Sequence, residues 1–155
     1  MAFKLNISEK SGKTWKMETE SETLLEKALG DKIEGRDLSG DLSGYEFEIT
    51  GASDNAGFPA YREVEGIALR KVLLGYGWGM HKKPRGTKKK GKKPEGMRRR
   101  KTVRGKIISP AIIQINMKIL KHGSKKLEEI FPEQNKAKEN SSKLGQVKEM
   151  KAEAQ

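Results

Sequence analysis

One internal stretch, residues 82–104, holds the side chains with the clearest chemical potential. It contains 13 of the chain's 33 lysines and arginines and a single acid, Glu95. Its net charge therefore equals the +12 of the whole chain, because the remaining residues balance with 20 basic and 20 acidic side chains. A chain that is neutral except in one segment dense in Lys and Arg carries a contact for a polyanion. Nucleic acid is the polyanion that this pattern favours.

The cations of this segment predict contacts with phosphates. Such contacts release counterions, so binding weakens steeply as the salt concentration rises. An arginine holds a phosphate with two bonds or stacks on an unpaired base, whereas a lysine acts as a compact charge. We expect the arginines to fix position and the lysines to supply affinity. The predicted RNA-binding residues are Lys82, Lys83, Arg85, Lys88, Lys89, Lys90, Lys92, Lys93, Arg98, Arg99, Arg100, Lys101 and Arg104.

Other interpretations of the basic segment fit less well. A solvated face is usually mixed in sign, and a localisation signal needs only about five to eight basic residues. Binding to a membrane surface would suit the charge, but no amphipathic helix with aromatic anchors accompanies it.

Glycines and aromatics alternate just upstream, in residues 75–81. One interpretation is that Tyr76 and Trp78 stack on bases while the glycines let the backbone approach a polyphosphate. The other is that Trp78 closes one end of the domain and the glycines form tight turns. The residues alone leave both open.

Catalytic and metal-binding arrangements have little support in this sequence. The chain has no cysteine, and His81 and His122 lie 41 positions apart, which leaves little from which to build a zinc site or a catalytic triad. Asp37 and Asp41 fall in turn sequence. Residues 51–59 lack the lysine and the glycine spacing of a phosphate-binding loop. We expect no enzyme activity, metal, cofactor or small-molecule substrate.

The elements that position the basic segment are predicted to be strands. Alternation of apolar and polar residues puts one face against a core and the other in water. It predicts strands over residues 3–8, 14–19, 45–50 and 113–120, the first two forming a hairpin. Short helices are expected over residues 21–29 and 124–131, where Gly30 and Pro132 follow as stops. The turn at residues 51–59 is expected to use Asp54 and Asn55 to bond its own backbone, with Phe58 returning to the core.

These elements indicate a mainly β fold. We expect a small closed or partly open β-barrel, since closure removes exposed edges, with one or two short helices, a long basic loop and a C-terminal helical or disordered tail. The expected parts are the first part of the barrel (1–81), the basic loop (82–105), the returning strand or strands (106–123) and a short helix with a mixed-charge tail (124–155). The loop alone in water is expected to be disordered.

Composition sets the remaining expectations. The hydrophobic fraction is 34% and the charged fraction is 35%, so part of these 155 residues is expected to stay outside a single core. No apolar run approaches the roughly 18 residues of a membrane span, and residues 1–7 do not resemble a signal peptide. The expected location is intracellular and cytoplasmic.

Three segments resemble the archaeal and eukaryotic small-subunit ribosomal protein six family. They are residues 3–7, the turn at 50–59 and the basic stretch at 98–105, and the similarity spans about residues 1–131. Two positions depart from the family pattern: Ala52 replaces the usual second glycine, and Ala60 stands where methionine is usual. The near-neutral tail differs from the phosphorylated basic helix of eukaryotic members, so a short archaeal form without that regulation is expected.

The resemblance implies a structural protein of the ribosome in the cytoplasm, with ribosomal RNA of the small subunit and neighbouring ribosomal proteins as partners. Two alternatives remain open. One is a free RNA- or DNA-binding regulator or RNA chaperone that uses the same loop, and the other is an enzyme acting on RNA, for which the sequence offers no preferred catalytic residue.

Overall fold

The structure is a computed structural model that describes residues 2–81 and 96–135. Seven strands and one short α-helix account for its regular elements, together with three single turns of 3-10 helix. The elements are β1 (Phe3–Ser8), β2 (Thr14–Thr19), β3 (Lys32–Glu34), β4 (Glu46–Asp54), β5 (Leu69–Leu74), β6 (Arg99–Arg104), β7 (Ile112–Lys121) and α1 (Leu127–Ile130). The prediction of a mainly β fold is therefore confirmed. In this part of the chain, no helix combines the length and the apolar character that crossing a membrane requires.

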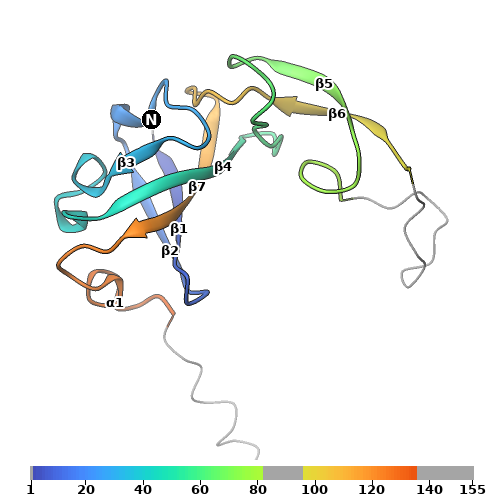
Figure 1. The fold of residues 1–155 in the computed structure, drawn as a ribbon. Helices are drawn as coiled ribbons and strands as arrows, with labels where there is room; N and C mark the ends of the chain where they lie inside the picture. The colour runs from blue at the N-terminus through green and yellow to red at the C-terminus, as the bar shows by residue number, and fades with distance from the viewer. Residues whose placement is uncertain (1, 82–95, 136–155) are drawn as a thin grey trace, which may run out of the picture.

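Five strands form the main sheet, in the order β2-β1-β7-β4-β3 (Figure 1). The β1 and β7 strands run parallel, and the other pairs are antiparallel. All four predicted strands are present in this sheet. The β4 strand is longer than predicted, because it continues through the glycine-containing stretch to Asp54.

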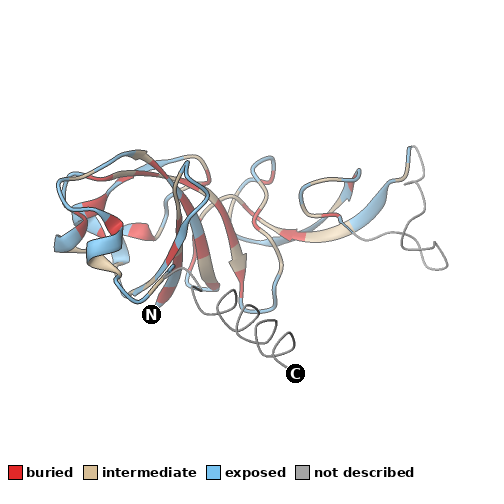
Figure 2. Cartoon of the chain, turned by 90° about the horizontal axis from the view of Figure 1, so that it is seen from below, coloured by how far each residue is buried: buried red, intermediate tan, exposed pale blue. Residues whose placement is uncertain are grey.

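The alternation of apolar and polar residues explains why the main sheet forms. In β1 and β7, Leu5 lies beside Ile115 and Ile7 lies beside Met117, and all four side chains are fully buried. Burying one such side chain contributes roughly 1.5–3 kcal/mol. Figure 2 colours buried residues red, and red stretches run along the strands of the sheet.

The main sheet is not closed, since β2 and β3 are its edges, so the predicted closed or partly open barrel is not confirmed. The β2 edge is covered by side chains instead of by another strand. The amide of Gln134 accepts from Lys16 N at 2.7 Å and donates to Lys16 O at 2.8 Å, and Asn135 donates to Thr14 O at 2.8 Å. These contacts satisfy backbone groups that an edge strand otherwise exposes, and β3 is only three residues long.

The predicted helix over residues 21–29 is also absent. Only Glu22–Leu24 forms a turn of 3-10 helix, after which Leu25 is extended and Glu26 has a φ of 66°. Ala28 then forms an isolated antiparallel bridge with Ile107. The extended path takes the buried Leu24 and Leu29 into the core, and this tertiary requirement overrides local helix propensity. The second predicted helix exists in shorter form as α1.

Candidate nucleic-acid interface

A two-stranded ribbon of β5 and β6 carries the described part of the basic segment, and it extends away from the main sheet (Figure 1). On one face of this ribbon, Val72, Leu74 and Val103 pack into a second small core with Val64 and Met80. Residues 99–104 were predicted to belong to a loop, but they form β6. That difference arises because their antiparallel partner, β5, supplies a ladder and apolar contacts.

Exposed cations line the free end of the ribbon. Arg98, Arg99 and Arg100 are exposed, and Lys101 is half-buried. The pairing places Arg99 opposite Leu74 and Arg100 opposite Leu73, so the extended backbone presents successive arginines to opposite faces. This arrangement gives the ribbon positive charge on both faces.

Sequence reasoning missed two cations of the ribbon. Arg70 and Lys71 are exposed on β5 and lie opposite Val103 and Thr102. Antiparallel pairing brings them beside the arginines of β6, although they precede the basic segment by more than ten residues. The available signal was their position next to the apolar run at Val72, because this run predicts a strand and a strand needs a pairing partner.

Arg104 differs from the other arginines of the segment. Its Nε donates to Asp54 Oδ2 at 3.0 Å, and its Nη1 donates to the carbonyl oxygen of Ile67 at 3.1 Å. The side chains are only 16% (Arg104) and 3% (Asp54) exposed. The sequence predicted a phosphate contact for Arg104, whereas the structure places its guanidinium in a buried ion pair that joins β4 to β6.

The turn after β4 forms the rest of this junction. Asp54 Oδ1 accepts from Phe58 N at 2.8 Å, as expected for Asp54. Phe58, however, is half-buried at the surface of the junction and does not enter the core, so that expectation was wrong. Beyond it, Ala60 is buried and bridges to Arg104, while Ala60 N donates to Ala52 O at 2.8 Å. The segment thus holds the ribbon to the sheet through backbone hydrogen bonds.

Trp78 lies at the tip of a tight turn beside this junction. Backbone hydrogen bonds of 3.0 and 3.1 Å join Gly77 and Met80 in both directions, and Met80 is buried in the second core. A Cβ added to Gly51 would lie 3.4 Å from Trp78 Cζ2, so the indole edge lies beside β4 at this position. Trp78 nevertheless remains 47% exposed. One edge of the indole therefore packs against the protein, and stacking of the exposed ring surface on a base stays a prediction.

Tyr76 does not share this position. Its ring makes an edge-to-face contact with His81 at a centroid distance of 6.2 Å, and Tyr76 is 45% exposed. Tyr76 therefore makes its ring contact with His81, whereas the indole edge of Trp78 lies beside Gly51.

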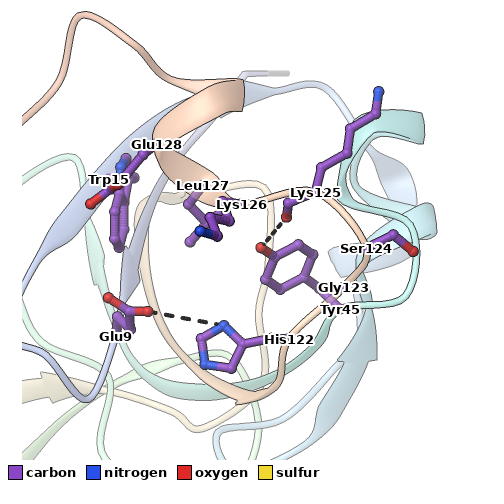
Figure 3. Close-up of a pocket in the computed structure, with 10 residues that line it drawn as sticks. All are labelled: Glu9, Trp15, Tyr45, His122, Gly123, Ser124, Lys125, Lys126, Leu127 and Glu128. Atoms are coloured by element: carbon purple, nitrogen blue, oxygen red, sulfur yellow. Dashed lines mark hydrogen bonds and ion pairs between the residues drawn. The ribbon is translucent and has the colours of Figure 1, made fainter.

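A hollow of about 430 Å³ lies at the end of the main sheet near α1 (Figure 3). Figure 3 shows Glu9 and His122 facing each other across it, with Glu9 Oε1 4.0 Å from His122 Nδ1. The hydroxyl of Tyr45 donates to the carbonyl oxygen of Lys125 at 2.5 Å, and burial raises the pKa of Tyr45. At 4.0 Å, the imidazole and the carboxylate lie beyond hydrogen-bond distance.

A metal centre finds no support in residues 2–81 and 96–135, where no three His, Asp or Glu side chains are grouped. Eight of the predicted RNA-binding residues lie outside the described residues and stay predictions. They are Lys82, Lys83, Arg85, Lys88, Lys89, Lys90, Lys92 and Lys93. The predicted tail also lies outside them from residue 136 onward.

Comparison with known proteins adds an independent finding. The sequence model of the family described as ribosomal protein S6e matches residues 3–132. The small ribosomal subunit protein eS6 of Methanococcus maripaludis strain S2 is 40% identical over 125 residues, covering 80% of this chain and 91% of that protein. The eS6 proteins of Nanoarchaeum equitans and Archaeoglobus fulgidus are 42% and 39% identical, with coverage of 80% and 84% of this chain and 84% and 96% of theirs.

Proposed function

The chain belongs to the ribosomal protein S6e family, and we propose that it is a structural constituent of the small ribosomal subunit that binds and stabilises folded ribosomal RNA. The relatives carry the name of a small-subunit protein, which supports a structural role in translation and a place in the cytoplasmic ribosome. The observation that supports RNA binding is the concentration of the chain's excess charge in residues 82–104. The described end of this segment includes β6, one of the two strands of the ribbon.

The ribbon suits contact with an RNA backbone for three physical reasons. Its exposed arginines offer planar donors for phosphates. The second core and the junction hold the strands in place, so the backbone that carries the cations needs little ordering on binding. The cations of β5, Arg70 and Lys71, widen the charged surface beyond the basic segment itself.

The roles within this surface differ. Arg98, Arg99 and Arg100 contact phosphates and fix the position of the ribbon. The lysines from Lys82 to Lys93 add affinity, and Lys101 contributes from its half-buried position. Arg104 acts through the junction, because its guanidinium already bonds Asp54. Tyr76 and Trp78 stack on unpaired bases.

The decisive test of assembly is sedimentation. A structural constituent remains bound to small subunits at one copy per subunit after a wash in moderately high salt, whereas a free regulator or RNA chaperone dissociates. Crosslinking in assembled subunits should link residues 82–104 to one discrete rRNA region. Crosslinks scattered over the rRNA, or loss of the protein in the wash, would contradict the proposal.

The contribution of the arginines is tested by salt dependence. Replacing Arg98, Arg99 and Arg100 together by Gln should lower the slope of log K against log salt by about two to three, since each phosphate contact contributes about 0.7–0.9. The matched control replaces three exposed lysines of the main-sheet region, Lys10, Lys32 and Lys126, and removes the same charge. An equal change in slope for both triple variants would show that net charge, and not the ribbon, determines binding.

A further inference from the structure

A second hollow, of about 630 Å³, lies where the turn after β4 meets the ribbon. We call it the Trp78 hollow. Its walls are Trp78 and His81 on one side, the turn around Phe58 and Pro59 on another, and Arg100, Lys101 and Thr102 of β6. The volume falls within the range of about 300–1,000 Å³ that is usual for small-ligand sites.

The Trp78 hollow combines aromatic and apolar walls with positive charge. Trp78 is 47% exposed and Phe58 is half-buried, so both expose ring surface to a ligand. Arg100 and Lys101 line the hollow from successive positions of β6, and none of the ten described residues that line the hollow is acidic. Its ligand should therefore have a flat aromatic part and an anionic part.

The exposure of Trp78 is held in place by its surroundings. The indole edge lies beside Gly51, where an added Cβ would come within 3.4 Å of Trp78 Cζ2. Gly79, next in the turn, has a φ of 74°, and a Cβ there would lie 3.0 Å from Leu74 Cδ1. Glycine alone fits comfortably at such a position. The turn and the contact with β4 therefore place the ring at the surface in the absence of a ligand, and a preorganised site loses less entropy on binding.

We infer that the Trp78 hollow binds one unpaired RNA nucleotide, with its base against Trp78 and its phosphate near Arg100 and Lys101. A paired base has both faces covered by its neighbours in the stack, whereas an unpaired base can be splayed out onto an aromatic side chain. This inference rests on the proposed function and deepens it. The protein would then recognise an unpaired nucleotide in the RNA in addition to contacting the phosphate backbone.

The test uses the full chain and two short RNA duplexes that differ only by one central unpaired adenosine. The bulged duplex should bind roughly tenfold more tightly, as expected for one base–aromatic stack. It should also quench tryptophan fluorescence. Trp15, the other tryptophan, is 1% exposed, so the quenching reports on Trp78.

Three variants assign the effect to the hollow. Trp78→Ala should bind both duplexes with the affinity that the wild type has for the paired one, while Trp78→Phe should keep most of the preference. Ala56→Glu places a carboxylate at an exposed position of the lining and leaves Trp78 itself unchanged, and it should also abolish the preference. Circular dichroism checks that each variant is folded.

The failures of the two proposals are distinguishable. If the wild type binds both duplexes equally, with salt dependence but no quenching, the inference is overturned and backbone binding stands. If neither duplex binds, the proposed RNA-binding function fails and the inference fails with it. Protection of Trp78 in assembled subunits by a protein neighbour, with no RNA crosslink at Trp78, would also overturn the inference.

Discussion

Replacing Arg104 by Met should destabilise the protein, although an arginine in a basic segment would ordinarily be dispensable for folding. The change leaves the Asp54 carboxylate, 3% exposed, without its cation. Removing one partner of a buried ion pair costs about 3–5 kcal/mol. Asp54 keeps the hydrogen bond from Phe58 N, so we expect a loss near the lower end, about 3 kcal/mol.

Urea unfolding followed by circular dichroism measures this loss. With a denaturant slope of about 1–3 kcal/mol per molar, the midpoint should fall by roughly 1–3 M. The matched control is Arg99→Met, at the exposed end of the same strand, which should change stability by about 0.5 kcal/mol or less. In the double variant of Arg104→Met with Asp54→Asn, the loss of stability should be smaller than the sum of the losses of the two single variants, by about 1.5–3 kcal/mol.

RNA binding supplies the contrasting measurement. Arg99→Met should lower the salt slope by about 0.7–0.9, whereas Arg104→Met should leave the slope of the folded protein unchanged. The opposite pattern, with stability kept and the slope lowered in Arg104→Met, would refute the assignment of Arg104 to the junction. It would restore the phosphate contact that the sequence predicts.

Two further predictions concern the junction and the main sheet. Gly105→Ala would place a Cβ 1.8 Å from Gly66 O and should destabilise the protein by at least about 1–3 kcal/mol. In the control Gly40→Ala, the added Cβ meets nothing within 4 Å, so its effect should be near neutral. Equal unfolding midpoints for the two variants would contradict this prediction. A hydrogen bond from Lys118 lowers the pKa of Glu48 below its usual 4.5, so the stability that this contributes is present above pH 4.5 and lost as the pH falls through the lowered value. The advantage of the wild type over Glu48→Gln should therefore shrink on acidification, and an advantage that stays constant down to pH 2 would count against it.

The sequence predicted the strands whose pattern is local. In β1, Phe3, Leu5 and Ile7 alternate with polar residues, and the same alternation decides which side chains face the core. The sequence pattern therefore predicts the buried face directly. The same logic failed where a strand has residues typical of turns. Gly51 lies inside β4 and packs beside Trp78, which is 27 positions away in the sequence. No local pattern contains that relation.

Long-range pairing also explains the helix that was predicted and is absent. Residues 21–29 have good helix propensity and a stop at Gly30, but Ala28 pairs with Ile107 and Glu26 adopts a positive φ. Helix propensities differ by less than about 1 kcal/mol per residue for ordinary side chains, whereas the burial of each of Leu24 and Leu29 contributes roughly 1.5–3 kcal/mol. Tertiary burial therefore decides the conformation of this segment.

The candidate interface shows the same limit in its charges. Composition identified the basic segment, but it could not distinguish Arg104 from Arg99, because their difference is the presence of Asp54, 50 positions earlier. The ribbon gathers cations from two strands around a second core of four buried residues, so its strands must form against mutual repulsion. The repulsion is offset where the ribbon meets the sheet, by the one arginine of β6 that has a buried acid as its partner. We therefore expect the end of the segment nearest the sheet to stabilise the fold and the outer end to bind the polyanion.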